Sequence, residues 1–186
     1  PGVETRGLSA SRRRADGRPW VDAADRVTCC HPLLAVHLYT GGRAEEVLGL
    51  EVRDVDLAAG RVHFRHNRWR RLKREHHPRS VPLWPALREV LVPYLAAAGL
   101  DRPGTPPDAL LFPSPVTGQM LYRFGKPLAR CLARAGLTEA AAGRRVTPHT
   151  LRHTFATALL QTLVPTADGE WAVRSSFDVA KQLGHR

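Results

Sequence analysis

The 186-residue sequence contains few cysteines, few aromatic residues and no long apolar run. Its three cysteines form neither a CxxC pair nor an even set, which excludes a disulfide framework and favours reduced thiols. Apolar residues make up 43% of the chain, but no stretch approaches the length that spans a membrane. The N-terminal arginines also lack the apolar segment of a signal peptide. We therefore expect a soluble cytoplasmic protein with no membrane partner.

Acidic residues are scarce relative to basic ones. Lys and Arg number 28 against 17 Asp and Glu, giving a net charge of +11 and a pI near 10.9, which indicates a nucleic-acid partner. The charge is concentrated in residues 65–79, which contain seven Arg or Lys and one Glu. A charge run is most often only a solvated face. RNA is the less favoured ligand because aromatics are only 6% of the chain and no RNP-like or KH-like motif occurs.

The chain divides into an N-terminal arm and one domain. Residues 1–19 are rich in Arg, Gly, Ser, Ala and Pro without apolar periodicity, which predicts a disordered basic arm or linker. Residues 20–186 are long enough for one domain with a core of its own. At its start, apolar residues flank a Thr40-Gly41-Gly42 break, which predicts two helices with Arg43 opening the second.

The middle of the domain predicts a small antiparallel sheet followed by helices. Alternation over residues 61–65 and an extended piece at residues 80–83 indicate a hairpin. Apolar spacing predicts a helix over residues 86–98, which Pro93 should kink or interrupt. Further helices are expected over residues 124–135 and 177–183. A loop from Val164 to Ser175 is expected just before the last of these helices. The fold class is α+β and mainly helical.

One further helix carries unusual polar residues in its first turns. Thr147 is a suitable N-cap and Pro148 suits the first helical position. His149 and Arg152 lie three residues apart, and apolar residues at four-residue spacing indicate that another face packs into the core. A helix start favours anions, and a bidentate arginine with an imidazole would complete a phosphate pocket.

Two simpler interpretations of this helix remain open. An exposed arginine and two histidines in a basic chain also fit a solvated helix face. His149 and His153 have the four-residue spacing of zinc-binding helices, but the intervening Glu of that motif is absent and Arg152 lies beside them. A metal-dependent nuclease using these histidines and His185 would also need a carboxylate cluster, which is not evident in the sequence.

Three blocks occur in an order typical of one family. They are Thr40-Gly41-Gly42-Arg43 with Glu46 and Leu50, His149-Thr150-Leu151-Arg152-His153, and Leu183-Gly184-His185. A basic stretch containing Lys73 and ending at Val81-Pro82-Leu83 lies between the first two. Together they resemble the catalytic domain of the tyrosine recombinases, the phage-integrase family. The resemblance implies that family's catalytic-domain fold with its small antiparallel sheet.

The resemblance also implies roles for five residues. Arg43 and Arg152 would clamp the nonbridging oxygens of the scissile phosphate, where charge rises toward the transition state. His149 would add a hydrogen bond or transfer a proton, and His185 would donate to the phosphate from the opposite side. Lys73 would be the general acid for the leaving 5′ oxygen. No metal, nucleotide or other cofactor is implied, because the phosphotyrosine conserves the bond energy.

Other residues are expected to bind DNA or to support the site. Glu46, one turn after Arg43, would orient an arginine, whereas His153 and Phe155 are assigned to packing. Trp69 and the arginines of the basic stretch would meet the DNA backbone. These arginines are Arg68, Arg70, Arg71 and Arg74, and either of the last two could replace Lys73 as the acid.

The family's nucleophile is a tyrosine shortly after the LGH histidine, and no tyrosine follows His185 here. Tyr39, Tyr94 and Tyr122 do not match its position. We therefore expect a C-terminally truncated, monomeric fragment that binds double-stranded DNA without cleaving it. In a full-length context it would act in site-specific recombination with other recombinase protomers at the nucleoid. The alternative is a non-catalytic DNA-binding remnant or regulator on the same scaffold.

Overall fold

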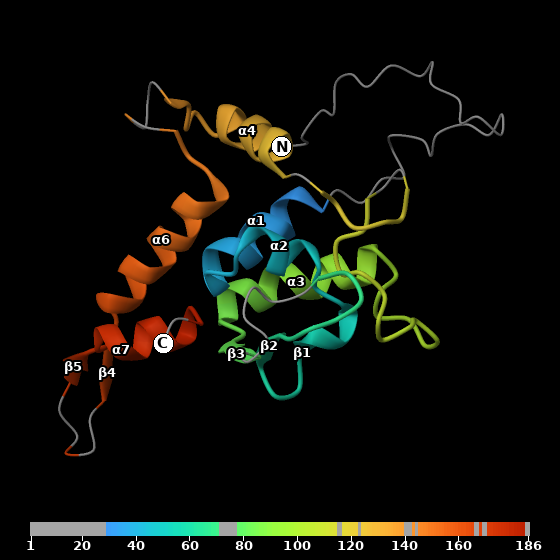
Figure 1. The fold of residues 1–186 in the computed structure, drawn as a ribbon. Coiled ribbons are helices and arrows are strands. Elements are labelled where there is room, and N and C mark those ends of the chain that lie inside the picture. Colours follow the sequence, from blue (N-terminus) through green and yellow to red (C-terminus); the bar gives the residue numbers. More distant parts are fainter. Residues whose placement is uncertain are drawn as a thin grey trace, which may run out of the picture.

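The computed structural model describes residues 29–70, 78–114, 117–122, 124–139, 143, 145–165, 168 and 171–184. Figure 1 shows how its elements are arranged. In chain order they are α1 (Cys30–Thr40), α2 (Ala44–Leu48), the 3-10 turn Val52–Asp54, β1 (Val55–Asp56), β2 (Arg61–Phe64), β3 (Arg79–Pro82), α3 (Pro85–Ala97), α4 (Gly125–Arg134), α6 (Pro148–Leu160), β4 (Leu163–Pro165), β5 (Trp171–Val173) and α7 (Ser176–Gln182). The predicted N-terminal arm lies outside the described residues. Among those described, no helix has both the length and the apolar character needed to cross a membrane.

The predicted break between the first two helices is confirmed at Gly41. Its φ of 60° is left-handed, and its N–H donates to the carbonyl of His37 at 3.1 Å, ending α1. A Cβ at this position would lie 2.3 Å from Cδ1 of Phe155 and 2.8 Å from Cδ2 of Leu183. Glycine is therefore required here both by the backbone conformation and by the close approach of α6 and the end of α7.

The predicted hairpin is also confirmed, as part of a three-stranded antiparallel sheet in the order β1-β2-β3. Val62 pairs with Val81, and Phe64 pairs with Arg79. Val62 and Phe64 are fully buried, while Arg61 is exposed, so the alternation read from the sequence matches the faces of β2. The hairpin places Arg79 opposite Phe64 at one end of the sheet.

The main core lies between α1, α3, α4 and the sheet (Figure 1). Helix α3 runs through Pro93 without interruption, so of the two predicted effects of Pro93 the interruption is wrong and the kink stays a prediction. Pro93 and its neighbour Val92 are exposed, and a carbonyl that loses its helical partner on the solvent side can bond water instead. The next residue, Tyr94, is buried, and its hydroxyl donates to the carbonyl of Leu111 at 2.7 Å.

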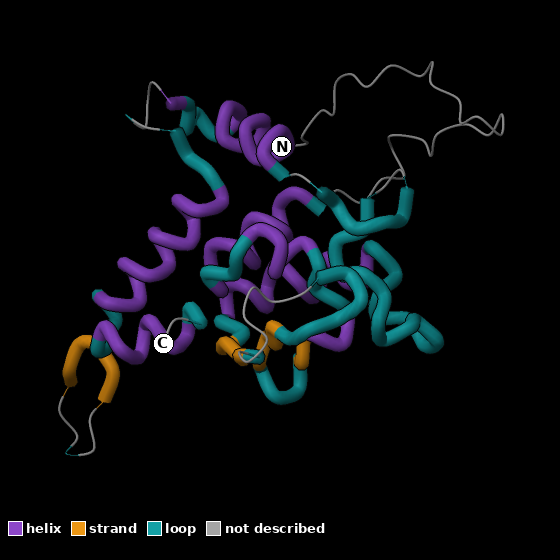
Figure 2. The backbone as a smooth tube through the Cα atoms, viewed as in Figure 1, coloured by secondary structure: helices purple, strands orange, loops and turns teal. Residues whose placement is uncertain are grey.

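The last elements form a smaller unit beside this core, as the backbone trace in Figure 2 shows. Its own apolar cluster is Phe155, Leu159, Val179 and Leu183, with Trp84 at its edge. The predicted loop over residues 164–175 is wrong in part, because β4 and β5 pair there as an antiparallel hairpin. The two strands are only three residues long and flank turn-forming residues, so their β-forming character is weak in the sequence.

Candidate functional site

A buried carboxylate organises the region between α2 and β3. The side chain of Glu46 is 6% exposed, and its oxygens accept hydrogen bonds from the backbone N–H of Arg43 at 2.8 Å and from Nη1 of Arg43 at 3.1 Å. They also accept from Nη1 and Nη2 of Arg79 at 3.0 and 2.6 Å. Burial alone would raise the pKa of Glu46, but Arg79 and Arg43 outweigh it and lower the pKa to about 2. Glu46 is therefore ionised at neutral pH and holds two guanidinium groups.

Arg43 occupies the N-cap of α2, as the sequence indicated. Its extended φ and ψ of −66° and 154° end the turn that begins at Gly41, and the contact with Glu46 at N3 closes the first turn of the helix. The side chain is 38% exposed. Glu46 thus fixes the direction of a guanidinium that is still accessible from solvent.

Arg79 is the site residue that sequence reasoning missed. Its side chain is 8% exposed, its Cζ lies 4.3 Å from the centroid of the Phe64 ring, and its two terminal nitrogens bind Glu46. Nη1 also lies 3.3 Å from where a Cβ of Gly184 would be, at the end of α7. Its place depends on the hairpin register, which pairs Arg79 with the inward-facing Phe64 and which the sequence pattern alone did not specify.

Arg152 lies in the same neighbourhood but is buried, with 6% relative exposure. Its Nη1 donates to the carbonyl of Gly41 at 2.5 Å and its Nη2 to the carbonyl of Leu183 at 2.6 Å. Burial lowers the pKa of Arg152 to about 10, and the nearby charges of Arg43 and Arg79 act in the same direction. The guanidinium therefore stays charged at neutral pH while it connects the α1–α2 turn to the end of α7.

The prediction that Arg152 lies on a face turned away from the core is wrong. Arg152, Phe155 and Leu159 follow one another at spacings of three and four and are all buried. The predicted apolar face included Leu151, which is only half-buried, whereas the buried face of the helix includes Arg152 in its place. The solvated-face interpretation therefore fails for Arg152, because its guanidinium is buried and donates to two backbone carbonyls.

The histidines of α6 lie on the exposed side of the helix. His149 and His153 are both exposed, with their Nε2 atoms 2.8 Å apart and their rings perpendicular at 85°. The assignment of His153 to packing is therefore wrong, whereas Phe155 is buried as expected. Four of the predicted site residues, Arg71, Lys73, Arg74 and His185, lie outside the described residues. Within the described part of the chain, no three His, Cys, Asp or Glu side chains are grouped to hold a metal ion.

The predicted DNA-contacting arginines separate into two kinds. Arg68 is exposed, forms an ion pair with Asp108 at 3.3 Å and stacks 4.6 Å from the centroid of the Trp69 ring. Arg70 is buried, donates to the carbonyl of Glu46 and lies 3.6 Å from a carboxylate oxygen of Asp54. Arg68 is therefore presented to solvent and Arg70 is not, and contact of either residue with DNA stays a prediction.

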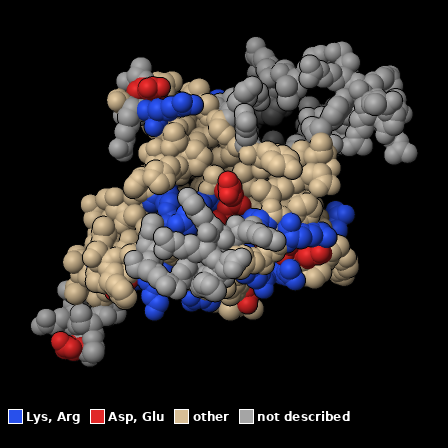
Figure 3. Space-filling model, viewed as in Figure 1, with Lys and Arg blue, Asp and Glu red and all other residues tan. Residues whose placement is uncertain are grey.

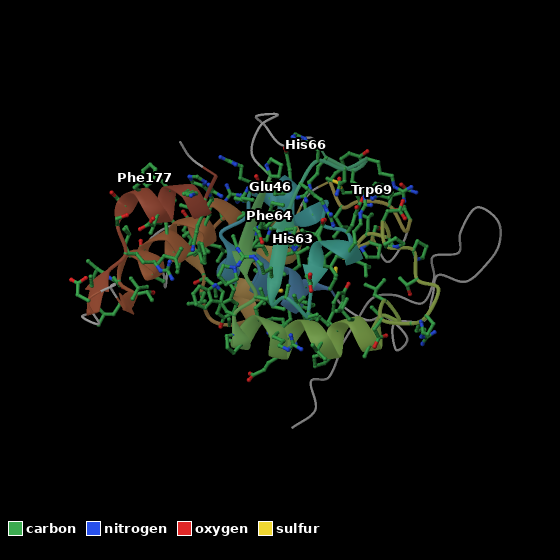
Figure 4. The ribbon with its side chains drawn as sticks, turned by 90° about the horizontal axis from the view of Figure 1, so that it is seen from below. Glu46, His63, Phe64, His66, Trp69 and Phe177 are labelled. Atoms are coloured by element: carbon green, nitrogen blue, oxygen red, sulfur yellow. The ribbon has the colours of Figure 1, made fainter. Side chains whose placement is uncertain are left out.

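Figures 3 and 4 show where basic side chains and the labelled residues lie. Figure 3 shows Lys and Arg side chains gathered over the three-stranded sheet. Figure 4, seen from below, shows Glu46 and Phe64 in the middle of the molecule and Phe177 well apart from them on α7. The arginine cluster, defined here as Arg43, Arg79 and Arg152 around Glu46, thus lies where α2, β3, α6 and the end of α7 meet.

Comparison with known proteins shows which family has this sequence pattern. Residues 23–170, which include the whole arginine cluster, match the model of the phage integrase family. The chain belongs to the phage integrase family. The match confirms the resemblance carried by the TGGR and HTLRH blocks, which lie within it.

Curated relatives of this integrase-family chain are tyrosine recombinases. The chain is 34% identical over 125 residues to tyrosine recombinase XerC of Pelobacter propionicus, covering 67% of this chain and 36% of that protein. It is 32% identical over 163 residues to tyrosine recombinase XerD of Brucella suis, covering 86% of this chain and 49% of that protein. The chain thus spans between about a third and a half of the length of these relatives.

Solved structures confirm the fold class. The XerH site-specific recombinase bound to its difH substrate aligns with a TM-score of 0.56 and 26% identity, over 84% of this chain and 39% of that one. The XerA recombinase aligns with a TM-score of 0.55 and 23% identity, over 89% of this chain and 56% of that one. At that identity the second comparison supports the fold alone.

Proposed function

We propose that this integrase-family domain acts in site-specific DNA recombination, by strand cleavage and rejoining through a 3′-phosphotyrosine intermediate. The observation that carries the proposal is the arginine cluster, in which one buried and ionised Glu46 orients an accessible Arg43 beside the charged Arg152. The names of the relatives support it, since they are tyrosine recombinases and a site-specific recombinase bound to DNA.

The charge balance of the cluster suits a phosphodiester. Three guanidinium groups surround one carboxylate, which leaves two positive charges for a ligand that carries one negative charge in the ground state. Charge on the nonbridging oxygens grows toward the transition state of phosphoryl transfer, and donors held in place beforehand stabilise it. Arg43 is the group that would contact these oxygens. Glu46, which Arg79 also binds, would hold Arg43 in place, and the buried Arg152 would add positive charge nearby.

The remaining roles follow the family resemblance. The phenol oxygen of a tyrosine attacks phosphorus and loses its proton, while the bond to the 5′ oxygen breaks and Lys73 protonates that oxygen to give a 5′-hydroxyl. His149 would either accept the phenol proton or hydrogen-bond the phosphate, and His185 would hydrogen-bond the phosphate. Rejoining is the reverse attack by a 5′-hydroxyl, so no nucleotide cofactor is needed. Tyr94 is not assigned as the nucleophile, because its hydroxyl is buried against the carbonyl of Leu111.

Binding to duplex DNA is the first test. We would measure the dissociation constant of the chain for a fluorescent duplex across a salt series, for the wild type and for Arg43→Ala. Each phosphate contact contributes a slope of about 0.9 in a plot of log affinity against log salt, so Arg43→Ala should lower the slope by about that amount. The matched control is Arg134→Ala, which removes an exposed arginine from the last turn of α4.

Equal slopes for Arg43→Ala and Arg134→Ala would count against a phosphate contact at the cluster. Cleavage needs a second experiment, in which the coding DNA beyond Arg186 is sequenced and the complete gene product is incubated with nicked duplex. A denaturation-resistant protein–DNA adduct that disappears with Arg43→Ala supports recombination. DNA binding without any adduct favours the non-catalytic DNA-binding alternative on the same scaffold.

A further inference from the structure

The exposed histidine pair on α6 has a geometry that the phosphate-binding role does not require. The Nε2 atoms of His149 and His153 are 2.8 Å apart, and both side chains are exposed. The pair stands on consecutive turns of a helix that is capped by Thr147 and anchored by the buried Phe155, so its backbone spacing is fixed. Two imidazole nitrogens held this close can share a proton or bind one cation together.

The separation of the two nitrogens selects the class of cation. At metal–imidazole distances of about 2.0–2.1 Å, nitrogens 2.8 Å apart subtend an angle of about 84–89° at the ion. A tetrahedral ion such as Zn²⁺ would need them about 3.3–3.4 Å apart at the same bond lengths. An angle near 90° fits the adjacent positions of a square-planar or octahedral ion, which Cu²⁺ and Ni²⁺ prefer with nitrogen ligands.

The neighbouring arginine does not oppose a cation at this place. Arg152 lies between the two histidines in sequence, but its guanidinium is buried and donates to the carbonyls of Gly41 and Leu183 on the other side of the helix. The positive charge of Arg152 therefore points into the protein and away from the two imidazoles. Solvent molecules can supply the remaining ligands, because both imidazoles are exposed.

The geometry points to a two-histidine site on α6, formed by His149 and His153, that binds a square-planar or octahedral divalent transition-metal ion of the Ni²⁺ and Cu²⁺ class. An ion there occupies the imidazole of His149, which the recombination proposal assigns to the reaction at the phosphate. This consequence rests on the proposed function, whereas binding of the ion does not. A test without DNA therefore separates failure of the metal site from failure of the proposed function.

Nickel is the suitable probe, because Cu²⁺ would also oxidise the free thiols of Cys29, Cys30 and Cys131. NiCl₂ is titrated calorimetrically into the purified chain at pH 7.5 in a non-chelating buffer. Two donors on one rigid helix bind far more tightly than one, so His153→Ala should weaken Ni²⁺ binding at least tenfold. His66→Ala, which removes an exposed histidine from outside α6, is the control and should bind like the wild type.

A second readout confirms the location of the ion. Ni²⁺ bound to folded α6 should raise the melting temperature of the wild type and of His66→Ala but not that of His153→Ala. Equal Ni²⁺ affinity in the wild type and His153→Ala would overturn the site. Tighter binding of Zn²⁺ than of Ni²⁺ at the pair would overturn the assigned class of ion.

Discussion

Removing the charge of Glu46 should destabilise the protein strongly. Glu46→Gln keeps the size of the side chain but leaves the buried Arg79, which is 8% exposed, without an anionic partner. The pKa of Glu46 is lowered from 4.5 to about 2, and each unit corresponds to about 1.4 kcal/mol, so we expect a loss of about 3 kcal/mol at pH 7. This agrees with the cost of about 3–5 kcal/mol for breaking a buried ion pair from one side.

The pH dependence of this loss has a definite sign. Because the folded-state pKa of Glu46 is below the unfolded value, its stabilisation is fully present above about pH 4.5 and is lost as the pH falls toward 2. The difference between wild type and Glu46→Gln should therefore be constant from pH 7 to pH 5 and shrink below that.

The assay is urea denaturation followed by circular dichroism, with Glu45→Gln as the matched control. Glu45 is the preceding residue of the same helix and is exposed, so its substitution should change the free energy of unfolding by no more than about 0.5 kcal/mol. If Glu46→Gln and Glu45→Gln unfold at the same urea concentration, the cluster does not stabilise the fold and our account of the carboxylate is wrong.

Three further predictions concern the same core and can be checked by equilibrium unfolding. Gly41→Ala should cost about 3 kcal/mol or more, because a Cβ would meet Phe155 at 2.3 Å, whereas Gly60→Ala, at a similar φ of 64° in open space, should cost only about 1 kcal/mol. Burial lowers the pKa of His37 from 6.5 to about 4, so the free energy of unfolding should fall by up to about 3 kcal/mol as the pH drops from 6.5 to 4. In His37→Gln, the free energy of unfolding should depend less on pH over that range. Tyr94→Phe should cost about 1 kcal/mol by loss of its buried hydrogen bond.

Local signals in the sequence predicted most of the elements. The break at Gly41, the cap at Thr147 and the alternation around Val62 each depend on residues a few positions apart, and all three are found in the structure. The pairing of β4 with β5 was missed because short strands are stabilised by their partner, which local propensity does not reveal. Whether α3 continues through Pro93 also depends on tertiary structure, because it matters which side of the helix faces solvent.

The sequence predicted the residues of the arginine cluster except Arg79, but not the contacts between them. Arg43 and Arg152 were found from motifs, and the position of Glu46 one turn after Arg43 pointed to a supporting role. The burial of Arg152 could not be read from its motif, because the carbonyls that satisfy it belong to residues 111 and 31 positions away. A long charged side chain is usually solvated, and only the tertiary contacts distinguish the buried Arg70 and Arg152 from the exposed Arg68.

Gly41 explains why blocks so distant in the sequence behave as one unit. Its left-handed backbone presents a carbonyl to Arg152, and its missing side chain leaves room for Phe155 from α6 and Leu183 from the end of α7. Leu183 in turn supplies the second carbonyl to Arg152. A change at any one of these positions must therefore disturb a hydrogen bond or a contact that another block provides. The TGGR, HTLRH and LGH blocks are thus coupled by backbone carbonyls of the turn and of the end of the last helix.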